Sequence, residues 1–156
     1  MRHSWHAYVT ACKYVERTMT DQDYLQMAID KGNEQQAPRN FGAVIVRDGE
    51  VLAVEHNHVH EEHDPTLHAE TSAIRAACKK IGNHNLNGGT MYGSHEPCLM
   101  CSSCAAWAEI DRIVYATPAS DQGFSYEFQD LNLADIAKKL KKPIKIEHLQ
   151  IEAGDN

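Results

Sequence analysis

Three residue types that bind zinc or move protons stand in two short segments of this chain. The first segment is His68-Ala69-Glu70, and the second is Pro97-Cys98-Leu99-Met100-Cys101. One imidazole and two thiolates hold a Zn²⁺ ion and leave its fourth position open to water, whereas structural zinc sites use four protein ligands. Glu70 follows the histidine closely enough to move protons for that water. The sequence therefore predicts a hydrolytic metal site with His68, Cys98 and Cys101 as ligands and Glu70 as the proton shuttle.

The cysteines and the composition indicate where such a site would work. Three of the five cysteines form the pattern Cys98-x-x-Cys101-x-x-Cys104, which suits metal binding in a reducing compartment better than a disulfide framework. The chain has 156 residues, of which 42% are apolar and 24% charged, as is ordinary for one globular domain. No apolar run reaches the length of a membrane span, and no segment resembles a secretory signal. We therefore expect a cytoplasmic enzyme that does not bind membranes.

The formal net charge of −7 bears on the kind of substrate. Proteins that bind nucleic acid usually present a basic face to the phosphates. The basic cluster Lys138-Lys139-Leu140-Lys141-Lys142 is better explained as the solvated end of a helix, where cations are favoured. The charge favours a small molecule over a polynucleotide as the partner.

The first part of the chain, residues 1–18, differs in pattern from residues 19–156. Met19-Thr20-Asp21 predicts a helix start, with Thr20 or Asp21 as the N-cap. The preceding segment is either an N-terminal extension without fixed structure or an extra short helix, because its apolar residues recur at helical spacing. We expect a single domain over residues 19–156.

Apolar patterning predicts alternating strands and helices in that domain. Phe41–Val46 has the pattern of a strand buried on both faces, Asp48-Gly49 that of a two-residue turn, and 51–55 that of the returning strand. Further strands are expected over 90–93, 113–116 and 144–151, and helices from just after 64–66 to 78, from 97 to about 109 and over 131–140. This order predicts an α/β fold in which helices cover a sheet.

The order of elements places both halves of the metal site at helix starts. His68 and Glu70 fall at or just before the first turn of one helix, and Cys98 and Cys101 on the first turn of the next. Residues three apart share one face of a helix, so both thiolates can point at one metal. The positive end of the helix dipole also favours a thiolate over a thiol.

This pairing of H-x-E with P-C-x-x-C resembles the cytidine deaminase-like superfamily of zinc enzymes. The resemblance covers roughly residues 21–123, and Phe41–Val46, Asn57, 64–66 and 96–98 place the chain nearest the guanine deaminases and tRNA adenosine deaminases. It implies a three-layer α/β/α fold with a central mixed sheet of about five strands, one Zn²⁺ per chain, and a homodimer. It also implies a hydrolase of C–N bonds in cyclic amidines, in which Glu70 takes a proton from zinc-bound water, the hydroxide attacks the ring, and ammonia leaves.

The resemblance assigns roles to further residues. Asn57 would hydrogen-bond the base, and the backbone N–H of Ala69 would help to hold it. Phe41 or Trp107 would offer a face for stacking. Asp121 is the best match to an acidic residue that assists guanine deamination, and we count it as a catalytic candidate beside Glu70.

Finer similarities favour a free purine-like base such as guanine as the substrate. Phe41, Trp107 and Gly123-Phe124 match guanine deaminases. Asn40 replaces a common proline, however, and residues 142–156 hold no clear counterpart of the segment that closes the guanine deaminase pocket. Deamination of another amino heterocycle (cytosine, a pterin or a triazine) or of tRNA adenosine is therefore the alternative.

Several of these residues have a structural explanation as well. Asn57 can simply form a turn after its strand, and Phe41 and Trp107 can be core aromatics. Asp121 can be an ordinary loop acid. Cys104 as a fourth ligand would close the site into a non-catalytic zinc-binding module, but we expect it to be a small buried residue one turn further along.

Four histidines alternate along the polar segment before the site. They are His56, His58, His60 and His63. We do not expect them to form a second metal site, because the sequence shows no carboxylates paired with them.

Overall fold

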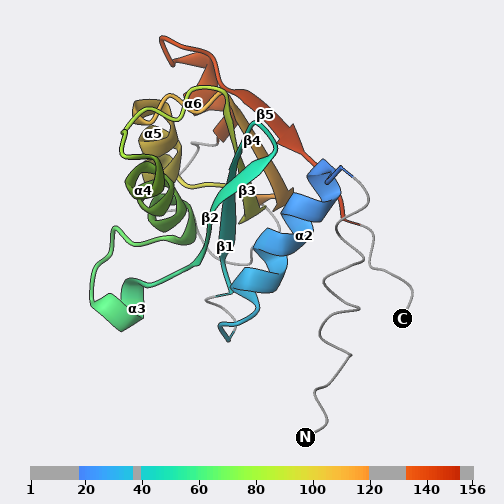
Figure 1. Ribbon diagram of the computed structural model, residues 1–156, viewed down its shortest axis with the longest axis vertical. Helices are drawn as coiled ribbons and strands as arrows, with labels where there is room; N and C mark the ends of the chain where they lie inside the picture. Colours follow the sequence, from blue (N-terminus) through green and yellow to red (C-terminus); the bar gives the residue numbers. More distant parts are fainter. Residues whose placement is uncertain (1–17, 37–39, 120–132, 152–156) are drawn as a thin grey trace, which may run out of the picture.

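A five-stranded sheet with helices on both faces organises the protein (Figure 1). The computed structural model describes residues 18–36, 40–119 and 133–151. The strand order is β2-β1-β3-β4-β5. β1 pairs antiparallel with both β2 and β3, whereas β3, β4 and β5 run parallel to one another. The sheet is therefore mixed, as the sequence analysis expected.

The first described helix, α2, covers Asp21–Gly32. Thr20 is its N-cap: the Thr20 hydroxyl accepts a hydrogen bond from the backbone N–H of Asp23, and the Asp23 carboxylate accepts one from the backbone N–H of Thr20. This reciprocal capping box satisfies N–H groups that have no partner within a helix. The predicted helix start at 19–21 is confirmed, while residues 1–17 lie outside the described part of the chain.

The predicted hairpin is present as β1 (Gly42–Arg47) and β2 (Glu50–His56). Its turn residues Asp48 and Gly49 have φ angles of 52° and 76°, as a type I′ turn requires at both central positions. Gly42 begins β1 because nothing larger fits: a Cβ there would lie 1.9 Å from the carbonyl oxygen of Ala28 in α2.

The remaining elements alternate between helix and strand. They are α3 (Val59–Glu62), α4 (Ala69–Ile81), β3 (Gly89–His95), α5 (Leu99–Trp107), β4 (Arg112–Thr117), α6 (Leu133–Lys138) and β5 (Lys145–His148). The sequence analysis missed α3, which is a single turn with no buried residue and so has no apolar periodicity to reveal it. It also extended the last strand to residue 151 and the helix that begins at residue 97 to about residue 109. In the structure β5 ends at His148 and α5 ends at Trp107, shortly before Glu109, which adopts the left-handed conformation at φ 61°.

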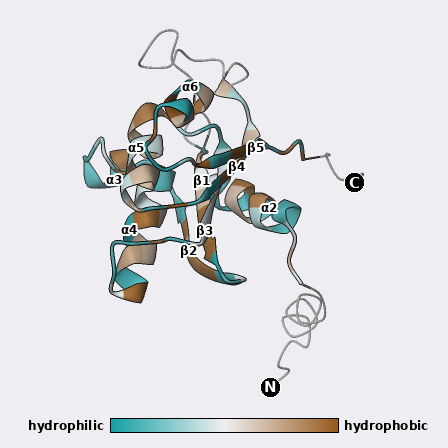
Figure 2. Cartoon of the chain, turned by 90° about the horizontal axis from the view of Figure 1, so that it is seen from above, coloured by the Kyte–Doolittle hydropathy of each residue, from teal (hydrophilic) through white to brown (hydrophobic). Residues whose placement is uncertain are grey.

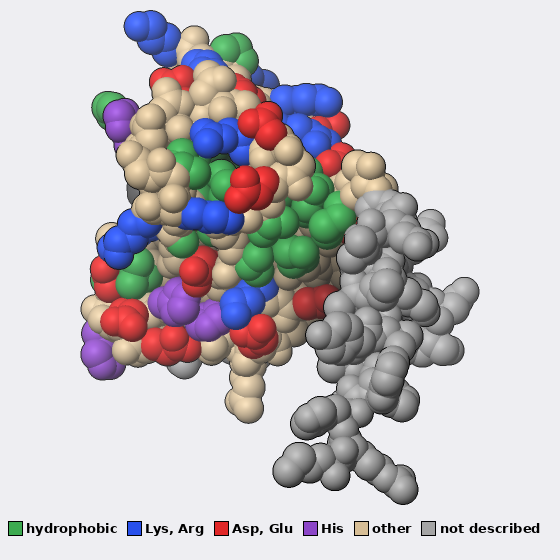
Figure 3. All heavy atoms as spheres, viewed as in Figure 1, with side chains coloured by type: hydrophobic (Ala, Val, Ile, Leu, Met, Phe, Trp, Pro, Cys, Tyr) green, Lys and Arg blue, Asp and Glu red, His purple; other side chains and the backbone are tan. Residues whose placement is uncertain are grey.

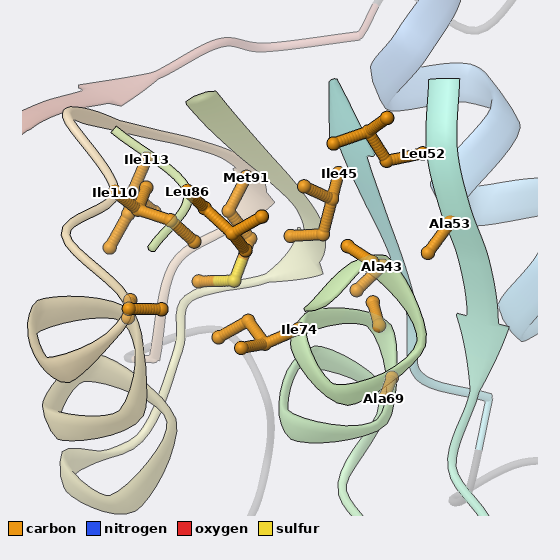
Figure 4. Packing of buried hydrophobic residues seen from close by; sticks show 14 of the residues in the cluster. Ala43, Ile45, Leu52, Ala53, Ala69, Ile74, Leu86, Met91, Ile110 and Ile113 are labelled. Atoms are coloured by element: carbon orange, nitrogen blue, oxygen red, sulfur yellow. The ribbon is translucent and has the colours of Figure 1, made fainter. Parts of the chain in front are cut away.

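Two hydrophobic clusters, one on each face of the sheet, make up the core. Because successive side chains of a strand point to opposite faces, Val44 and Val46 of β1 pack under α2, while Ala43 and Ile45 pack under α4. Figure 4 shows the larger cluster, in which Ile74 of α4 meets the strand side chains. Figure 2 shows the same arrangement from above, with the strands between α2 on one side and α4 and α5 on the other.

This arrangement confirms the expected α/β fold with helices on both faces of a mixed sheet. Within the described ranges, no helix is both long and apolar enough to cross a membrane.

Candidate metal centre and active site

The N-terminus of α4 carries the first half of the site. His68 is the N-cap residue, with extended backbone angles, and the first helical hydrogen bond runs from the Ser72 N–H to the His68 carbonyl oxygen. Ala69 and Glu70 follow in the first turn and are buried, with exposed fractions of 0% and 6%. The N–H groups of a first helical turn have no acceptor within the helix. The role of the Ala69 N–H in holding a substrate stays a prediction.

The N-terminus of α5 carries the second half. Cys98 is the N-cap, and its carbonyl oxygen accepts hydrogen bonds from both the backbone N–H and the hydroxyl of Ser102. Cys101 lies in the first turn and is fully buried. The sequence analysis placed Cys98 inside the first turn, but it precedes the helix, because Pro97 and Cys98 connect the end of β3 to α5.

His68, Cys98 and Cys101 converge on one point. The distances Cys98 Sγ to His68 Nδ1, Cys101 Sγ to His68 Nδ1, and Cys98 Sγ to Cys101 Sγ are each 3.5 Å. A tetrahedral ion with Zn–S bonds of about 2.3 Å and a Zn–N bond of about 2.0 Å holds such donors about 3.5–3.8 Å apart. The spacing and the chemistry of the three donors therefore fit one Zn²⁺ ion with its fourth position free.

The two thiols differ in acidity. The Cys98 sulfur receives hydrogen bonds from the Cys101 thiol and from His68, and these lower the pKa of Cys98 to about 4. The pKa of the Cys101 thiol is raised, because that thiol donates to Cys98 and is buried. A coordinated metal ion favours the thiolate form of both residues, because a thiol that binds a metal is deprotonated.

Glu70 lies beside this triangle of donors. Its Oε2 is 3.5 Å from Cys101 Sγ. Burial, and after it the neighbouring Cys98, raises the pKa of the Glu70 carboxyl to about 7. A carboxyl with that pKa can both accept and return a proton near neutral pH, as general acid–base catalysis requires.

Asn57, which follows the end of β2, lies next to Phe41, which precedes the start of β1. The backbone N–H of Asn57 donates to the Phe41 carbonyl oxygen at 3.2 Å, which ties the end of β2 to the start of β1. The Asn57 side-chain oxygen accepts from the Val59 N–H at 3.0 Å, so its amide N–H groups are the ones left to donate to a ligand.

The Phe41 ring meets His95, a residue at the end of β3 to which the sequence analysis gave no metal role. The two rings lie edge to face with centroids 4.7 Å apart. Burial lowers the pKa of His95, which keeps its ring neutral. The Ser94 hydroxyl accepts from the Gly42 N–H and lies 2.9 Å from His95 Nδ1, so it can donate to that nitrogen. The proton of His95 is then on Nε2.

The other candidates are placed differently. Trp107, at the end of α5, is 85% exposed, so the alternative of a core aromatic is wrong for it, and its stacking role stays a prediction. Cys104 packs against the hydrophobic cluster under α4 and is not one of the three converging donors. Asp121 and Gly123-Phe124 lie outside the described residues.

Glu96 is a structural residue of the site to which the sequence analysis gave no role, although it lies in the segment 96–98 that carries the family resemblance. Its carboxylate accepts a hydrogen bond from the Ala119 N–H at 2.8 Å and another from the Leu133 N–H at 3.3 Å. It thereby holds the chain after β4 and the start of α6 against the segment that leads into Cys98. Its place just before Pro97-Cys98 was the available signal, but its partners are distant in sequence.

Comparison with known proteins identifies the family. The model of the cytidine and deoxycytidylate deaminase zinc-binding region matches residues 18–117, which contain both halves of the site. The chain belongs to this deaminase family.

Within the family, two kinds of relatives are similar to this deaminase chain. Guanine deaminase of Bacillus subtilis (strain 168) is 42% identical over 106 residues, which are 66% of this chain and 64% of that protein. A tRNA-specific adenosine deaminase of Aquifex aeolicus (strain VF5) is 40% identical over 75 residues, 48% of this chain and 50% of that protein. The chain thus matches less than two thirds of the length of these curated relatives.

Solved structures from both of these groups also resemble the chain. An X-ray structure of guanine deaminase from Bacillus subtilis superposes with a TM-score of 0.65 at 34% identity, covering 87% of this chain and 88% of that one. A structure from a study of A-to-I editing by tRNA:A34 deaminases has a TM-score of 0.68 at 27% identity, covering 80% and 91%. The membership of the guanine and tRNA adenosine deaminase branch, predicted from the motifs, is confirmed.

Proposed function

We propose that this protein is a zinc-dependent hydrolytic deaminase that acts on a free purine-like base, as guanine deaminases do, and releases ammonia. The observation that carries the proposal is Glu70. Its buried carboxyl lies 3.5 Å from Cys101 Sγ, beside three donors spaced for Zn²⁺. A structural zinc site needs no such proton carrier, so Glu70 argues against a non-catalytic zinc-binding module.

His68, Cys98 and Cys101 would hold the ion, which supplies a water whose pKa is lowered to about 7. Glu70 would take the proton of the attacking water. It would pass that proton to the ring nitrogen, then take the remaining proton from the oxygen now bonded to the ring carbon and pass it to the departing amine. Water and the amino-substituted ring thereby become the oxo product and ammonia. The amide of Asn57 and the backbone N–H of Ala69 would hold the base in position. Phe41 would limit the pocket where β1 begins.

The choice of a small purine-like base rests on similarity and charge. The guanine deaminase relative shares 42% identity over its matched part. The formal net charge of −7 disfavours a polynucleotide, whose phosphates attract basic faces. Acidic and basic side chains are interspersed over the face seen in Figure 3. The tRNA adenosine deaminases are similar enough to make tRNA adenosine the second candidate.

We also propose that the chain works as a homodimer in a reducing compartment, with the cytoplasm as the place. The exposed Trp107 offers apolar area to a second copy, and the four described cysteines are free thiols.

Replacement of Glu70 tests the chemistry. Glu70→Gln keeps the shape of the side chain but cannot carry the proton. We expect one bound zinc per chain by elemental analysis, and a rate of ammonia release at least about 10²–10⁴-fold lower. Glu62→Gln, an exposed carboxylate of the short helix α3, is the matched control and should keep both. Unchanged ammonia release by Glu70→Gln would refute the proposed mechanism.

A substrate panel tests the specificity. Ammonia release should be measured with guanine, adenine, cytosine, their nucleosides, a pterin, a triazine and a tRNA anticodon stem. Guanine should give the highest kcat/KM. Preference for the anticodon stem would replace the free-base proposal by the second candidate, and inertness toward every compound would favour the non-catalytic module.

A further inference from the structure

A second group of metal-ligand side chains lies outside the site described above. It consists of His56 at the end of β2, His58 in the following loop, and Glu61 in α3. One ligand atom from each of the three residues lies within 4.8 Å of the other two. Figure 3 shows histidine and acidic side chains gathered toward the lower left, in the region of α3. The sequence analysis found no carboxylates paired with these histidines, but the folded chain places Glu55 and Glu61 beside His58.

His58 lies between two carboxylates. Its Nε2 is 2.9 Å from Glu55 Oε2, and its Nδ1 is 3.0 Å from Glu61 Oε2. A neutral imidazole has one N–H, and a carboxylate only accepts. Glu55 and Glu61 raise the pKa of His58 against the opposing effect of burial, and the protonated ring donates to both carboxylates. When the ring is neutral with its proton on Nε2, the lone pair of Nδ1 faces the oxygen of Glu61. Two acceptors at that distance require a proton or a cation between them.

His56 is prepared to bind the same cation. Its Nδ1 is 3.1 Å from the carbonyl oxygen of Asn57, which can only accept, so Nδ1 carries the proton and Nε2 keeps its lone pair. The His56 and His58 rings lie side by side with centroids 4.1 Å apart. Metal-binding histidines characteristically donate their other N–H to a carbonyl or a carboxylate. His56 with Asn57, and His58 with Glu55, both follow that arrangement.

The Glu61 carboxylate is held in place to act as the third ligand. Gln35 Nε2 donates to Glu61 Oε1 at 3.0 Å, which leaves Oε2 directed at His58. Glu61 is exposed, and His58 lines a surface cleft of about 900 Å³ together with Glu55, so both of these ligands are in contact with solvent.

We propose that His56, His58 and Glu61 form a second divalent-metal site, separate from that of His68, Cys98 and Cys101. Two imidazoles and one carboxylate suit Zn²⁺, Ni²⁺ or Cu²⁺ and not Ca²⁺ or Mg²⁺, which prefer oxygen ligands alone. Glu55 is a positioning residue that fixes the His58 ring. Glu61 is exposed and the two histidines are half-buried, whereas Cys101 of the first site is fully buried, so the ion at the second site exchanges more readily.

An ion at this site would act on the segment that carries Asn57. Asn57 stands between the two histidines, and the backbone N–H of His58 donates to the Leu67 carbonyl oxygen at 3.0 Å, directly before His68. The bound ion would therefore stiffen the connection from β2 to α4. This consequence rests on the proposed role of Asn57 in binding the base, but the metal site itself does not.

The test is zinc binding to the full chain that already holds its first equivalent. At pH 8, equilibrium dialysis with elemental analysis should show a second equivalent per chain as free zinc is raised. His58→Gln and Glu61→Gln should each weaken the second equivalent by more than about tenfold and leave the first unchanged. Glu55→Ala, which removes only the positioning carboxylate, should weaken it about 10–100-fold.

Two histidines of the same segment provide matched controls. His60 and His63 are exposed and are not part of the cluster. His60→Gln and His63→Gln should bind the second equivalent as the wild type does. The proposal is overturned if wild-type protein takes up no second equivalent at millimolar zinc, if His58→Gln and Glu61→Gln bind it unchanged, or if the two controls weaken it equally. Because the readout is bound metal, failure of the deaminase proposal would not affect this result.

Discussion

At the scale of single residues, side-chain direction decides which of three similar cysteines can bind metal. Cys98, Cys101 and Cys104 follow one another at three-residue intervals. Cys98 and Cys101 lie 3.5 Å from each other and from His68, whereas Cys104 packs into the hydrophobic cluster under α4. Cys104 is not among the donors that converge within 4.8 Å of one another, so its place in the fold excludes it from this group. An ion held by these three donors alone would keep its fourth position for a water, as the proposed hydrolytic reaction requires.

This difference gives a prediction for zinc content. Cys104→Ala should retain one zinc per chain, because it removes only a packing side chain. Cys101→Ala removes a ligand. It should therefore weaken zinc binding by more than the about 10–100-fold that is typical when a residue supporting a ligand is lost. Elemental analysis after dialysis measures both. Loss of zinc from Cys104→Ala would mean that the site has four protein ligands.

At the scale of the elements, carboxylates join segments that are far apart in the chain. Glu96 accepts from the backbone N–H groups of Ala119 and Leu133, at the two described ends that flank residues 120–132. The Asp21 carboxylate in α2 accepts hydrogen bonds from both terminal nitrogens of Arg112 in β4, at 2.8 and 2.6 Å. The Tyr92 hydroxyl in β3 donates to the same carboxylate at 2.7 Å. These contacts fix the helices relative to the sheet that bears the site.

Replacement of Glu96 should affect stability first. Glu96→Ala leaves two N–H groups without their acceptor, and hydrogen bonds to a charged group contribute about 1.5–3 kcal/mol each when buried. Glu96 is only half-buried, so we expect a loss of about 1–2 kcal/mol in the free energy of unfolding, measured by urea denaturation. Glu96→Gln retains one acceptor oxygen and should lose less. Equal stability of Glu96→Ala and wild type would show that this carboxylate does not hold the two segments.

The contact between α2 and β4 predicts a dependence of stability on pH. The hydrogen bonds from Arg112 lower the pKa of Asp21 from 3.8 to about 2 in the folded protein. The unfolded chain therefore binds this proton first as pH falls, and the stabilisation is fully present above about pH 4 and disappears toward pH 2. Asp21→Asn should be less stable at pH 7 and should lose less further stability between pH 4 and pH 2. If the free energy of unfolding falls equally in the two proteins between pH 4 and pH 2, this expectation is contradicted.

At the scale of the whole molecule, the metal site joins two helices and so couples to folding. Its ligands come from the starts of α4 and α5, which pack over the same hydrophobic cluster. An ion that binds the folded state alone stabilises it by about 2.7 kcal/mol when free metal exceeds the dissociation constant a hundredfold. For a protein of this size that corresponds to a rise in Tm of about 5–10 °C.

Chelation should reverse this stabilisation. Wild-type protein treated with a strong chelator should melt about 5–10 °C lower by calorimetry and recover when zinc is restored. Cys101→Ala should melt at a temperature that chelator does not change. The same chelator shift in Cys101→Ala and in wild type would place the stabilising ion elsewhere.

How much of this could be read from the sequence depends on how local each interaction is. The capping box at Thr20, the turn at Asp48-Gly49 and the buried β1 strand are determined within a few residues, and all three were predictable. The short helix α3 and the partners of Glu96 were not, because α3 has no apolar face and the partners lie beyond residues 97–117.

The sequence by itself determined the family, the α/β fold and the set of donors, because donor chemistry and hydrophobic periodicity are both written in residue types and short spacings. The tertiary structure alone decided which donors meet. It brings His68 to Cys98 and Cys101 and leaves Cys104 half-buried against the core. It also brings Glu55 and Glu61 to either side of His58, because the turn of α3 folds that loop back on the end of β2. Such contacts depend on the path of the chain in space, which spacing in sequence does not fix.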